Sequence, residues 1–525
     1  MKLLRSLAAA ASFGLLSLTA QAALPATSLT TAAEALALLP EVRLPASEVQ
    51  QRIVSLKHEP LRFAVPTALN LDERSGSWSR SAEGLARWQL RVDSAGARSL
   101  ALRLSEVNLP PAAELWFYDT MGRDVQGPIT AARINTATRE LSLPLVRSDA
   151  AVLEVRVPVA QQNQVAFKIN EAYHGYRSIN AAADSGNSPK AAIGDDAGSC
   201  NIDVVCTEGN NWRNEIRSTV LLVTTNQSLC TGSLVNNTRQ DDRALVLTAN
   251  HCGIRSTNIG SVIAYFNTQS TSCGGNQNGR IDQNIDGGSF LARDENSDFT
   301  LFSLASLPPA AFNVLYAGWD ARSGVAPQSG VTMHHPQGDE KKIAVYSTAG
   351  TAQEDICIGN GVGNSCDGFL VDSWRVTWSR GTTEAGSSGS GLWNQNRQLV
   401  GVLSGGGASC GTPNEPDFFG RIERAWQANA ATNGQLKAHL DPIGSNCLQL
   451  NSKNPGTASP LGSCGSSGGG GGSTPENAAG SSSLLGLVVL LMGAGLRRRL
   501  RLARRASHTA GNVARGKRSI MPEKT

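Results

Sequence analysis

The sequence predicts an all-β protein whose central region, from Cys200 to Cys447, forms two β-barrels with a site between them. Three observations predict this class. Short β-branched runs such as STVLLVTT and QLVGVLSGG recur along the region, clusters of Gly, Asn, Ser and Asp separate them, and no long helical period interrupts them. A β-sandwich has the same pattern, but a length of roughly 250 residues suits a pair of barrels.

The ten cysteines of the 525-residue chain all lie between Cys200 and Cys464, and none lies in the first 199 residues. This change of composition marks a boundary inside a chain long enough for two or three domains. An even number of cysteines in one region indicates disulfides formed in an oxidising compartment, although spacing alone does not choose their pairing. The spacing is irregular and contains no Cys-x-x-Cys pair, so we expect no zinc, no other metal and no cofactor.

The N-terminus predicts export. Lys2 and Arg5 precede an apolar stretch over residues 3–18, and small residues follow it up to Ala22. These are the parts of a secretory signal peptide. We therefore expect residues 1–22 to be removed and the mature protein to be secreted.

Residues 23–190 predict a separate β-rich unit without cysteines. Apolar and polar residues alternate there as on half-buried strands, with the apolar positions at Trp88, Leu90, Val92, Leu100, Leu102, Leu104, Leu153, Val155, Val157 and Val159. Residues 180–198 are rich in Ala, Ser, Gly and Asp without apolar periodicity, which is typical of an exposed, cleavable linker. We expect a prosegment, cut off after Lys190, that inhibits the next region or helps it to fold.

Three short segments follow the barrel region, which we place at residues 191–450. Residues 451–482 form a linker rich in Gly and Ser, residues 483–505 combine an apolar run with an arginine cluster, and residues 506–525 are a basic extension. The apolar run of thirteen residues is shorter than the ~20 that span a bilayer. The arrangement resembles the glycine-rich sorting tails of secreted bacterial proteins, which a membrane protease removes. A permanent membrane anchor is the alternative.

The net charge of +4 comes from the last 29 residues, Arg497 to Thr525, which carry ten Lys or Arg and one Glu. That tail contributes +9, so the rest of the chain sums to about −5. This balance gives no reason to propose a nucleic-acid surface, and we expect no nucleic-acid partner.

Three segments carry residues suited to serine hydrolysis. LTANHCG places His251 at the end of an apolar strand, SDFTLFSL places Asp298 at the head of another, and EAGSSGSGLW places Ser388 in a glycine-rich turn. A serine nucleophile needs a neighbouring base, a carboxylate to orient that base, and donors for the developing oxyanion. The chain order His, Asp, Ser distinguishes double-barrel proteases from α/β-hydrolases and subtilisin-like enzymes. The sequence therefore predicts a catalytic triad of these three residues.

From Cys200 to Arg421 the chain resembles the lysyl endopeptidases, a bacterial branch of the trypsin-like serine peptidases. The resemblance is carried by SCNIDVVC, CTGSLVNN, LTANHCG, SDFTL, HHPQGDEK, TEAGSSGSGLW, GGGASC and DFFGR. It implies a chymotrypsin-like double β-barrel, the same triad, and an oxyanion hole formed by the backbone N–H groups of Gly386 and Ser388. It also implies an endopeptidase that acts on proteins or peptides.

The resemblance implies a disulfide map as well. Its pairs are Cys200 with Cys410, Cys206 with Cys273, and Cys230 with Cys252. The last pair tethers the strand that precedes the predicted catalytic histidine. For the remaining four cysteines, proximity in the sequence suggests Cys357 with Cys366 and Cys447 with Cys464.

A pocket for a cationic side chain needs a carboxylate to replace the water that lysine or arginine gives up on binding. Ordinary trypsins carry it six residues before the nucleophile, where this chain has Thr382. Lysyl endopeptidases use an aspartate after the last barrel cysteine, and Asp417 occupies the matching place. The resemblance thus implies cleavage after lysine, and more slowly after arginine, in a pocket walled by Ser404, Gly405 and Gly406.

Two positions depart from the pattern. Ser387 stands where trypsin-like enzymes carry the aspartate that receives the new N-terminal ammonium, so we expect activation by release of the prosegment instead. Ser404 stands where lysyl endopeptidases carry a histidine. For Asp417, an ordinary turn residue after Pro416 is the alternative interpretation.

Other conspicuous residues have structural interpretations. His334 and His335 with Asp339 suit a structural loop better than a metal site, because adjacent histidines point in different directions along a strand. Trp374 and Trp378 suit core packing. Two alternative functions stay open: an inactive binding or adhesion module with a protease fold, and an active trypsin-like peptidase of another specificity.

Overall fold

The computed structural model describes residues 29–45, 60–135, 138–178, 197–274, 279–359, 361–362 and 365–458. The predicted signal peptide, the bond after Lys190 and the predicted C-terminal tail lie outside these residues. We call residues 29–178 the N-terminal module and residues 197–458 the barrel region. Among the described residues, no helix is long and apolar enough to cross a membrane.

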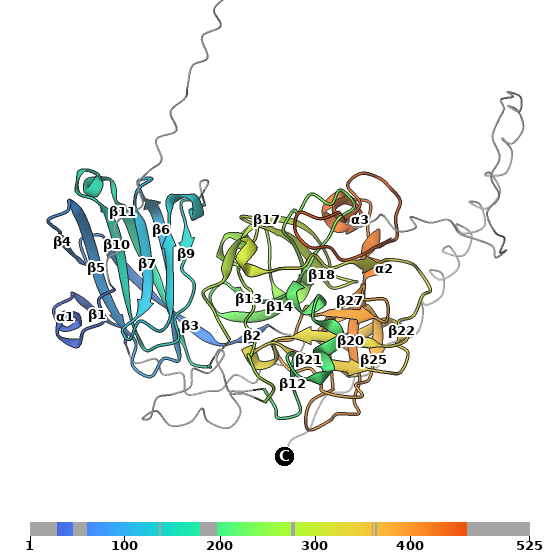
Figure 1. Cartoon of the computed structure of the whole chain (residues 1–525). Coiled ribbons are helices and arrows are strands. Elements are labelled where there is room, and N and C mark those ends of the chain that lie inside the picture. The colour runs from blue at the N-terminus through green and yellow to red at the C-terminus, as the bar shows by residue number, and fades with distance from the viewer. Residues whose placement is uncertain are drawn as a thin grey trace, which may run out of the picture. The chain divides into compact units, whose positions relative to one another are not determined.

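The N-terminal module is a sandwich of two sheets (Figure 1). One sheet has the strand order β1-β5-β10-β7-β8, with β4 paired to β5, and the other has the order β3-β11-β6-β9. Only β1 and β5 pair in parallel among these described strands. The elements are α1 (Ala33–Ala37), β1 (Glu41–Arg43), β3 (Ala64–Asp72), β4 (Ser77–Arg80), β5 (Leu85–Asp93), β6 (Ser99–Asn108), β7 (Glu114–Asp119), β8 (Val125–Ile129), η1 (Ala131–Arg133), β9 (Leu141–Ser142), β10 (Ala150–Pro158), η2 (Val159–Gln164) and β11 (Ala166–Gly175).

The core of the module follows the predicted alternation. Alternate side chains of β5, β6 and β10 form one buried cluster, because successive side chains of a strand point to opposite faces. These are Trp88, Leu90, Val92, Leu100, Leu102, Leu104, Leu153, Val155 and Val157. The pattern ends earlier than predicted, since β10 stops at Pro158 and Val159 begins η2, where it is only partly buried. Proline has no N–H with which to continue the strand ladder.

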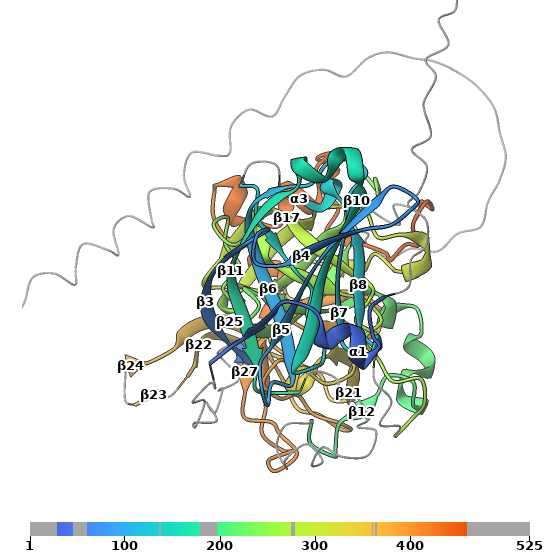
Figure 2. The same cartoon turned by 90° about the vertical axis from the view of Figure 1, so that its left-hand side faces the viewer.

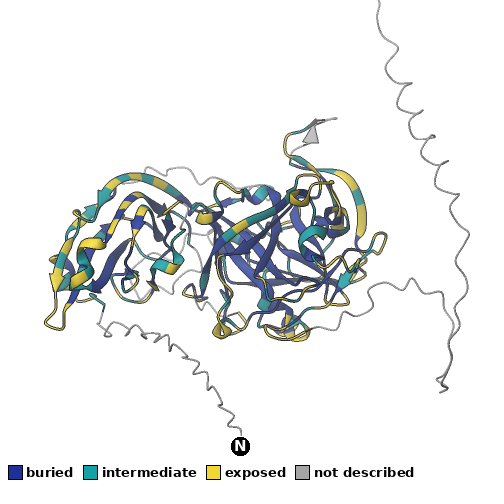
Figure 3. Ribbon diagram, turned by 90° about the horizontal axis from the view of Figure 1, so that it is seen from above, coloured by how far each residue is buried: buried dark blue, intermediate teal, exposed yellow. Residues whose placement is uncertain are grey.

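The first half of the barrel region is a closed barrel. Its order is β13-β16-β17-β18-β15-β14, and the pairing of β13 with β14 closes it. The predicted apolar runs form β13, β15 and β18, whose residues are all buried (Figure 3). The elements are η3 (Thr207–Trp212), η4 (Glu215–Ser218), β13 (Thr219–Thr224), β14 (Ser228–Val235), β15 (Leu245–Ala249), η5 (Asn250–Cys252), η6 (Ile259–Ser261), β16 (Ile263–Tyr265), β17 (Asn284–Asp294), β18 (Phe299–Leu304) and η7 (Ala310–Phe312).

The second half is built on the row β21-β20-β26-β27-β28-β25. A bridge between Val345 on β21 and Arg380, just beyond β25, joins the two ends of this row. Shorter strands and two short helices surround it. The elements are β12 (Ile202–Asp203), β19 (Trp319–Asp320), β20 (Gly330–His334), η8 (Pro336–Gly338), β21 (Lys342–Tyr346), β22 (Thr351–Ile358), β23 (Gly361–Val362), β24 (Ser365–Cys366), β25 (Phe369–Val376), β26 (Gly391–Asn394), β27 (Leu399–Gly406), β28 (Asp417–Arg421), α2 (Ile422–Trp426), η9 (Thr432–Gly434), α3 (Lys437–Leu440) and β29 (Gln449–Leu450).

Disulfides tie distant parts of the barrel region together. The pairs among the described residues are Cys200–Cys410, Cys206–Cys273, Cys230–Cys252 and Cys357–Cys366. They are the three pairs that the resemblance implies and one of the two expected from proximity. The pair on β22 and β24 staples the hairpin that carries β23 and β24 at its end (Figure 2). Cys447 is also disulfide-bonded, and its expected partner Cys464 lies outside the described residues.

The module adds a strand to the first barrel. Strand β2 (Leu61–Arg62) pairs antiparallel with the start of β14, so that Leu61 lies opposite Leu229. Both regions contribute to one apolar cluster at this junction. The module supplies Leu61, Phe63, Ala64, Ala101, Leu145 and Tyr173, and the barrel supplies Leu221, Val223, Leu229, Ile263, Tyr265, Ile281 and Ala385.

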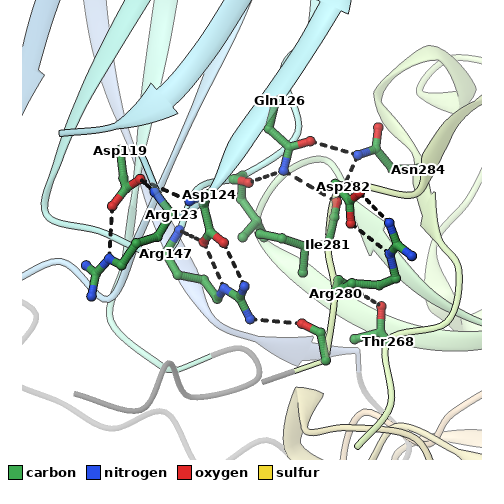
Figure 4. Close-up of polar contacts among 12 residues, drawn as sticks. Asp119, Arg123, Asp124, Gln126, Arg147, Thr268, Arg280, Ile281, Asp282 and Asn284 are labelled. Carbon is green, nitrogen blue, oxygen red and sulfur yellow. Dashed lines mark hydrogen bonds and ion pairs between the residues drawn. The ribbon is translucent and has the colours of Figure 1, made fainter. Parts of the chain in front are cut away.

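Polar contacts extend this junction (Figure 4). Gln126 of the module accepts a hydrogen bond from the side-chain amide of Asn284 at 2.8 Å. Arg147 donates to the Gly279 carbonyl at 3.0 Å, and the carboxylate of Asp124 holds the same guanidinium from the module side at 2.7 Å. Two partners on one guanidinium fix its position better than a single exposed ion pair would.

Candidate active site

His251 lies where the apolar strand β15 ends and the 3₁₀ turn η5 begins. Cys252 in the same turn is bonded to Cys230 on the adjacent strand β14. The turn is therefore tied covalently to the neighbouring strand, which limits how far the histidine can shift.

Asp298 holds this histidine at two points. Its Oδ2 accepts a hydrogen bond from His251 Nδ1 at 2.8 Å, and its Oδ1 accepts one from the backbone N–H of His251 at 2.9 Å. The carboxylate is fully buried just before β18, where the backbone of Asp298 is left-handed with φ of 44°. Because an ionised carboxylate only accepts, the ring proton sits on Nδ1 and Nε2 is the basic nitrogen. Nε2 is buried without a hydrogen-bond partner among the described residues.

Ser388 lies in a tight turn that we call the Ser388 turn, residues 384–390. Thr231 on β14 holds it from the first barrel, because its N–H donates to the Ser388 carbonyl at 2.8 Å and its Oγ1 donates to the Gly386 carbonyl at 3.0 Å. Cys252 Sγ lies 3.8 Å from the Ser388 carbonyl oxygen. The turn therefore packs against η5, which carries His251.

Two glycines give the Ser388 turn its shape. Gly386 and Gly389 have φ of 92° and 83°, a left-handed backbone that favours glycine. A side chain at Gly386 would also place its Cβ 2.8 Å from the carbonyl oxygen of His335. The N–H of Gly389 donates to the Leu403 carbonyl on β27 at 2.9 Å, so the second barrel holds the turn as well.

Asp417 is fully buried at the start of β28. Its Oδ2 accepts hydrogen bonds from Trp378 Nε1 and from Thr383 Oγ1, both at 2.7 Å. These two hydrogen bonds orient the carboxylate inside the second barrel.

Of the three residues predicted to wall the pocket, Gly406 lies beside this carboxylate. Gly406 at the end of β27 faces Asp417 in the strand register, and a Cβ on Gly406 would lie 2.3 Å from Asp417 Oδ1. Gly405 faces the next residue of β28. Ser404 is fully buried, and its Oγ has no hydrogen-bond partner among the described residues. Thr382 is buried too and brings no charge.

The two adjacent histidines have separate contacts, as the structural interpretation expects. His334 Nδ1 lies 2.8 Å from Ser387 Oγ, whereas His335 Nδ1 lies 3.0 Å from the Asp339 carbonyl oxygen. Burial lowers the pKa of His335 to about 3, and the nearby ammonium of Lys341 adds to this effect. His335 is therefore neutral at any pH near 7.

Three residues of the site escape the sequence-based prediction. Trp374 and Trp378 pack in the core of the second barrel as expected, but Trp378 also binds Asp417, and Thr383 does so beside it. Phe369 stacks on the ring of His251, with centroids 5.4 Å apart and 23° between the planes. The spacing Trp-x-x-x-Trp is also typical of core residues. No signal in the sequence marks the contacts of Trp378, Thr383 and Phe369 with the site.

Two adjoining β-barrels, with a His–Asp pair in the first and a glycine-flanked serine turn held by both, define a protein of the chymotrypsin-like double-barrel class. The comparisons with known proteins are consistent with this class. The family model "Lysyl endopeptidase N-terminal domain" matches residues 42–175, and "Lysyl endopeptidase, C-terminal domain" matches residues 194–420.

A lysyl endopeptidase of Pseudomonas aeruginosa is 30% identical over 394 residues, which cover 68% of this chain and 77% of that protein. The chain therefore belongs to the lysyl endopeptidase family, and it is a peptidase. Solved structures of the Rv3671c protease of M. tuberculosis match more weakly. The active form has a TM-score of 0.29 and 16% identity over 44% of this chain and 90% of that chain, and an inactive form has 0.27 and 17% over 40% and 85%. Likeness at this level adds nothing to the family assignment.

Proposed function

We propose that the chain is the precursor of a secreted serine endopeptidase. Ser388 attacks the peptide carbonyl, His251 Nε2 accepts the serine proton, and Asp298 orients the ring and balances the imidazolium that forms. The N–H groups of Gly386 and Ser388 stabilise the oxygen of the tetrahedral intermediate. Collapse of the intermediate expels the amine, which takes the proton from the histidine. Water then hydrolyses the acyl-enzyme by the same route in reverse.

One observation supports this proposal most. A buried carboxylate holds Nδ1 of His251 at 2.8 Å, and Nε2 of the same ring has no hydrogen-bond partner among the described residues. This is the arrangement that a general base for a serine requires. The Ser388 turn packs against the segment that carries this ring.

Labelling with a fluorophosphonate probe tests the proposal. We expect the parent protein to be labelled at Ser388, and the Ser388→Ala variant to lose labelling and at least about 10⁴-fold in kcat while it still folds. Ser379→Ala is a matched control, because its exposed hydroxyl binds only the Val345 carbonyl, away from the site. Turnover that survives in Ser388→Ala would place the nucleophile elsewhere. A parent chain that folds and takes no label would favour the binding-module alternative.

We also propose that Asp417 selects lysine. The support is a fully buried carboxylate whose two neutral donors, Trp378 and Thr383, both bind Oδ2. A lysine ammonium is a point charge that one carboxylate can balance. A planar guanidinium prefers two free acceptor oxygens side by side, and Oδ2 already accepts two hydrogen bonds. Arginine should therefore be cleaved more slowly.

The N-terminal module is proposed to be a prosegment that inhibits the barrel region or helps it to fold. Strand β2 adds to β14, and Leu61 Cδ2 lies 3.2 Å from the position that a Cβ on Gly386 would take. The module therefore touches the predicted oxyanion turn. Arg133 of the module also pairs with both carboxylate oxygens of Asp286, at 2.5 and 2.8 Å.

Processing is proposed at both ends of the chain. The sequence supports removal of the signal peptide after Ala22, cleavage after Lys190 by the lysine-directed enzyme itself, and removal of the C-terminal tail by a membrane protease. The mature enzyme would then act outside the cell on protein or peptide substrates, after transient attachment to the inner membrane.

A further inference from the structure

A buried contact links the residue before Ser388 to a histidine on another strand. Ser387 and His334 are both fully buried, and Ser387 Oγ lies 2.8 Å from His334 Nδ1. The same hydroxyl accepts a hydrogen bond from the backbone N–H of Glu384 at 3.2 Å. The Ser387 side chain thus joins the start of the Ser388 turn to strand β20.

A second side chain of β20 holds the other end of the turn. Thr332 Oγ1 lies 3.1 Å from Ser390 Oγ and 3.0 Å from the Gly391 carbonyl oxygen. Thr332 and His334 are two residues apart, so they lie on the same face of the strand. One face of β20 therefore contacts the turn on both sides of Ser388.

The contact has a direct geometric link to the predicted oxyanion hole. The N–H of Ser388 belongs to the peptide plane that follows Ser387, so any rotation of the Ser387 backbone turns that N–H. Ser387 is also held through its own backbone, because its N–H donates to the Glu384 carbonyl and its carbonyl accepts from Ser390. The side-chain contact with His334 ties Ser387 itself to strand β20.

We propose that His334 and Ser387 form a positioning pair that fixes the N–H group of Ser388 toward the oxyanion. The proposal rests on the proposed function, in which Ser388 is the nucleophile. The pair takes the place of the aspartate and N-terminal ammonium on which trypsin-like enzymes rely, and it needs no new N-terminus. Both residues are positioning residues that act through the Ser388 turn.

Kinetics of Ser387→Ala, His334→Ala and the double variant test the pair. Rates are counted per active site by fluorophosphonate titration of the protein after activation, with a lysine peptide anilide that the parent hydrolyses. We expect each single variant to lose about tenfold in kcat at unchanged KM, because displacement of an oxyanion donor weakens the transition state alone. Affinity for a peptide boronate, whose tetrahedral adduct occupies the oxyanion hole, should fall by the same factor. The double variant should lose no more kcat than each single variant, since each single substitution already removes the same contact between Ser387 and His334.

His334→Asn is the rescue variant, because its side-chain amide can reach the place of Nδ1 and should restore most of kcat. Ser218→Ala is the matched control, since Ser218 in the barrel region is also fully buried and its hydroxyl donates to the Glu215 carbonyl at 2.7 Å. It should leave kcat per active site unchanged. A loss of about a hundredfold in the kcat of the double variant would overturn the pair. So would an affinity for the boronate that stays constant while kcat falls. Failure of the proposed function would appear earlier, as a parent chain without labelling or hydrolysis.

Discussion

At the level of one residue, the proposal that Asp417 selects lysine can be tested directly. The carboxylate is fully buried, and its Oδ2 accepts hydrogen bonds from Trp378 and Thr383. We expect Asp417→Asn to lower kcat/KM for lysine peptides by more than tenfold, or about 1.4 kcal/mol, because the substrate ammonium loses its counter-charge. The measurement is the hydrolysis of matched lysine, arginine and leucine anilides.

Glu415→Gln is the matched control for this prediction, because it removes an exposed carboxylate two residues away and should change kcat/KM little. A loss well below tenfold in Asp417→Asn, or an equal loss in the control, would show that Asp417 does not set the specificity.

The site residues differ in how far the sequence predicts them. His251 and Ser388 stand in segments whose neighbours are distinctive, and the pairing of Asp298 with His251 follows the expected geometry. Trp378 and Phe369 look like core residues, because an aromatic side chain that only packs and one that also contacts the site leave the same sequence pattern. Their contacts become visible only when β25 is placed against its neighbours.

At the level of elements, the residue that follows β20 is the buried His335, whose protonation should destabilise the fold. The pKa of His335 is lowered to about 3, against 6.5 in the unfolded chain, so the unfolded state binds more protons between these pH values. Stability is therefore lost as the pH falls from 6.5 towards 3. Between pH 7 and 5 this histidine alone accounts for about 2 kcal/mol.

We expect His335→Asn to remove this part of the acid sensitivity. Its amide can still donate to the Asp339 carbonyl, as Nδ1 does at 3.0 Å in the parent. In urea unfolding of parent and variant, both carrying Ser388→Ala to prevent self-digestion, the parent should lose about 2 kcal/mol more stability than the variant between pH 7 and pH 5. Equal losses in both proteins on acidification would mean that the imidazole takes up its proton in the folded state. Between pH 7 and 8 the two curves should run parallel.

The sequence predicts strands where buried and exposed residues alternate regularly, and it misses strands that pair over only two residues. The alternation on β5, β6 and β10 predicts the sandwich strands, because one face of each lies in the core. Strand β2 has two residues, and its partner on β14 lies more than 160 residues along the chain. So short a segment has no period to detect, and its pairing depends on the apolar cluster that surrounds it.

For the whole molecule, Leu61 is a module residue that lies against both β14 and the Ser388 turn. We expect Leu61→Asp, in a full chain with Ser388→Ala, to open this junction, because a carboxylate without a partner in an apolar cluster costs several kcal/mol. Amide hydrogen exchange should then become at least tenfold faster at the start of β14 and in the Ser388 turn. Leu38→Asp is the matched control, since Leu38 is 84% exposed in the same module. Unchanged exchange in Leu61→Asp would show that the turn does not depend on the module.

Gly386 is confined from two sides, by the His335 carbonyl of its own barrel and by Leu61 of the module. Each region supplies one side of this contact, so a larger side chain at residue 61 would need an answering change around the turn. Modules exchanged between distant relatives should therefore fit poorly.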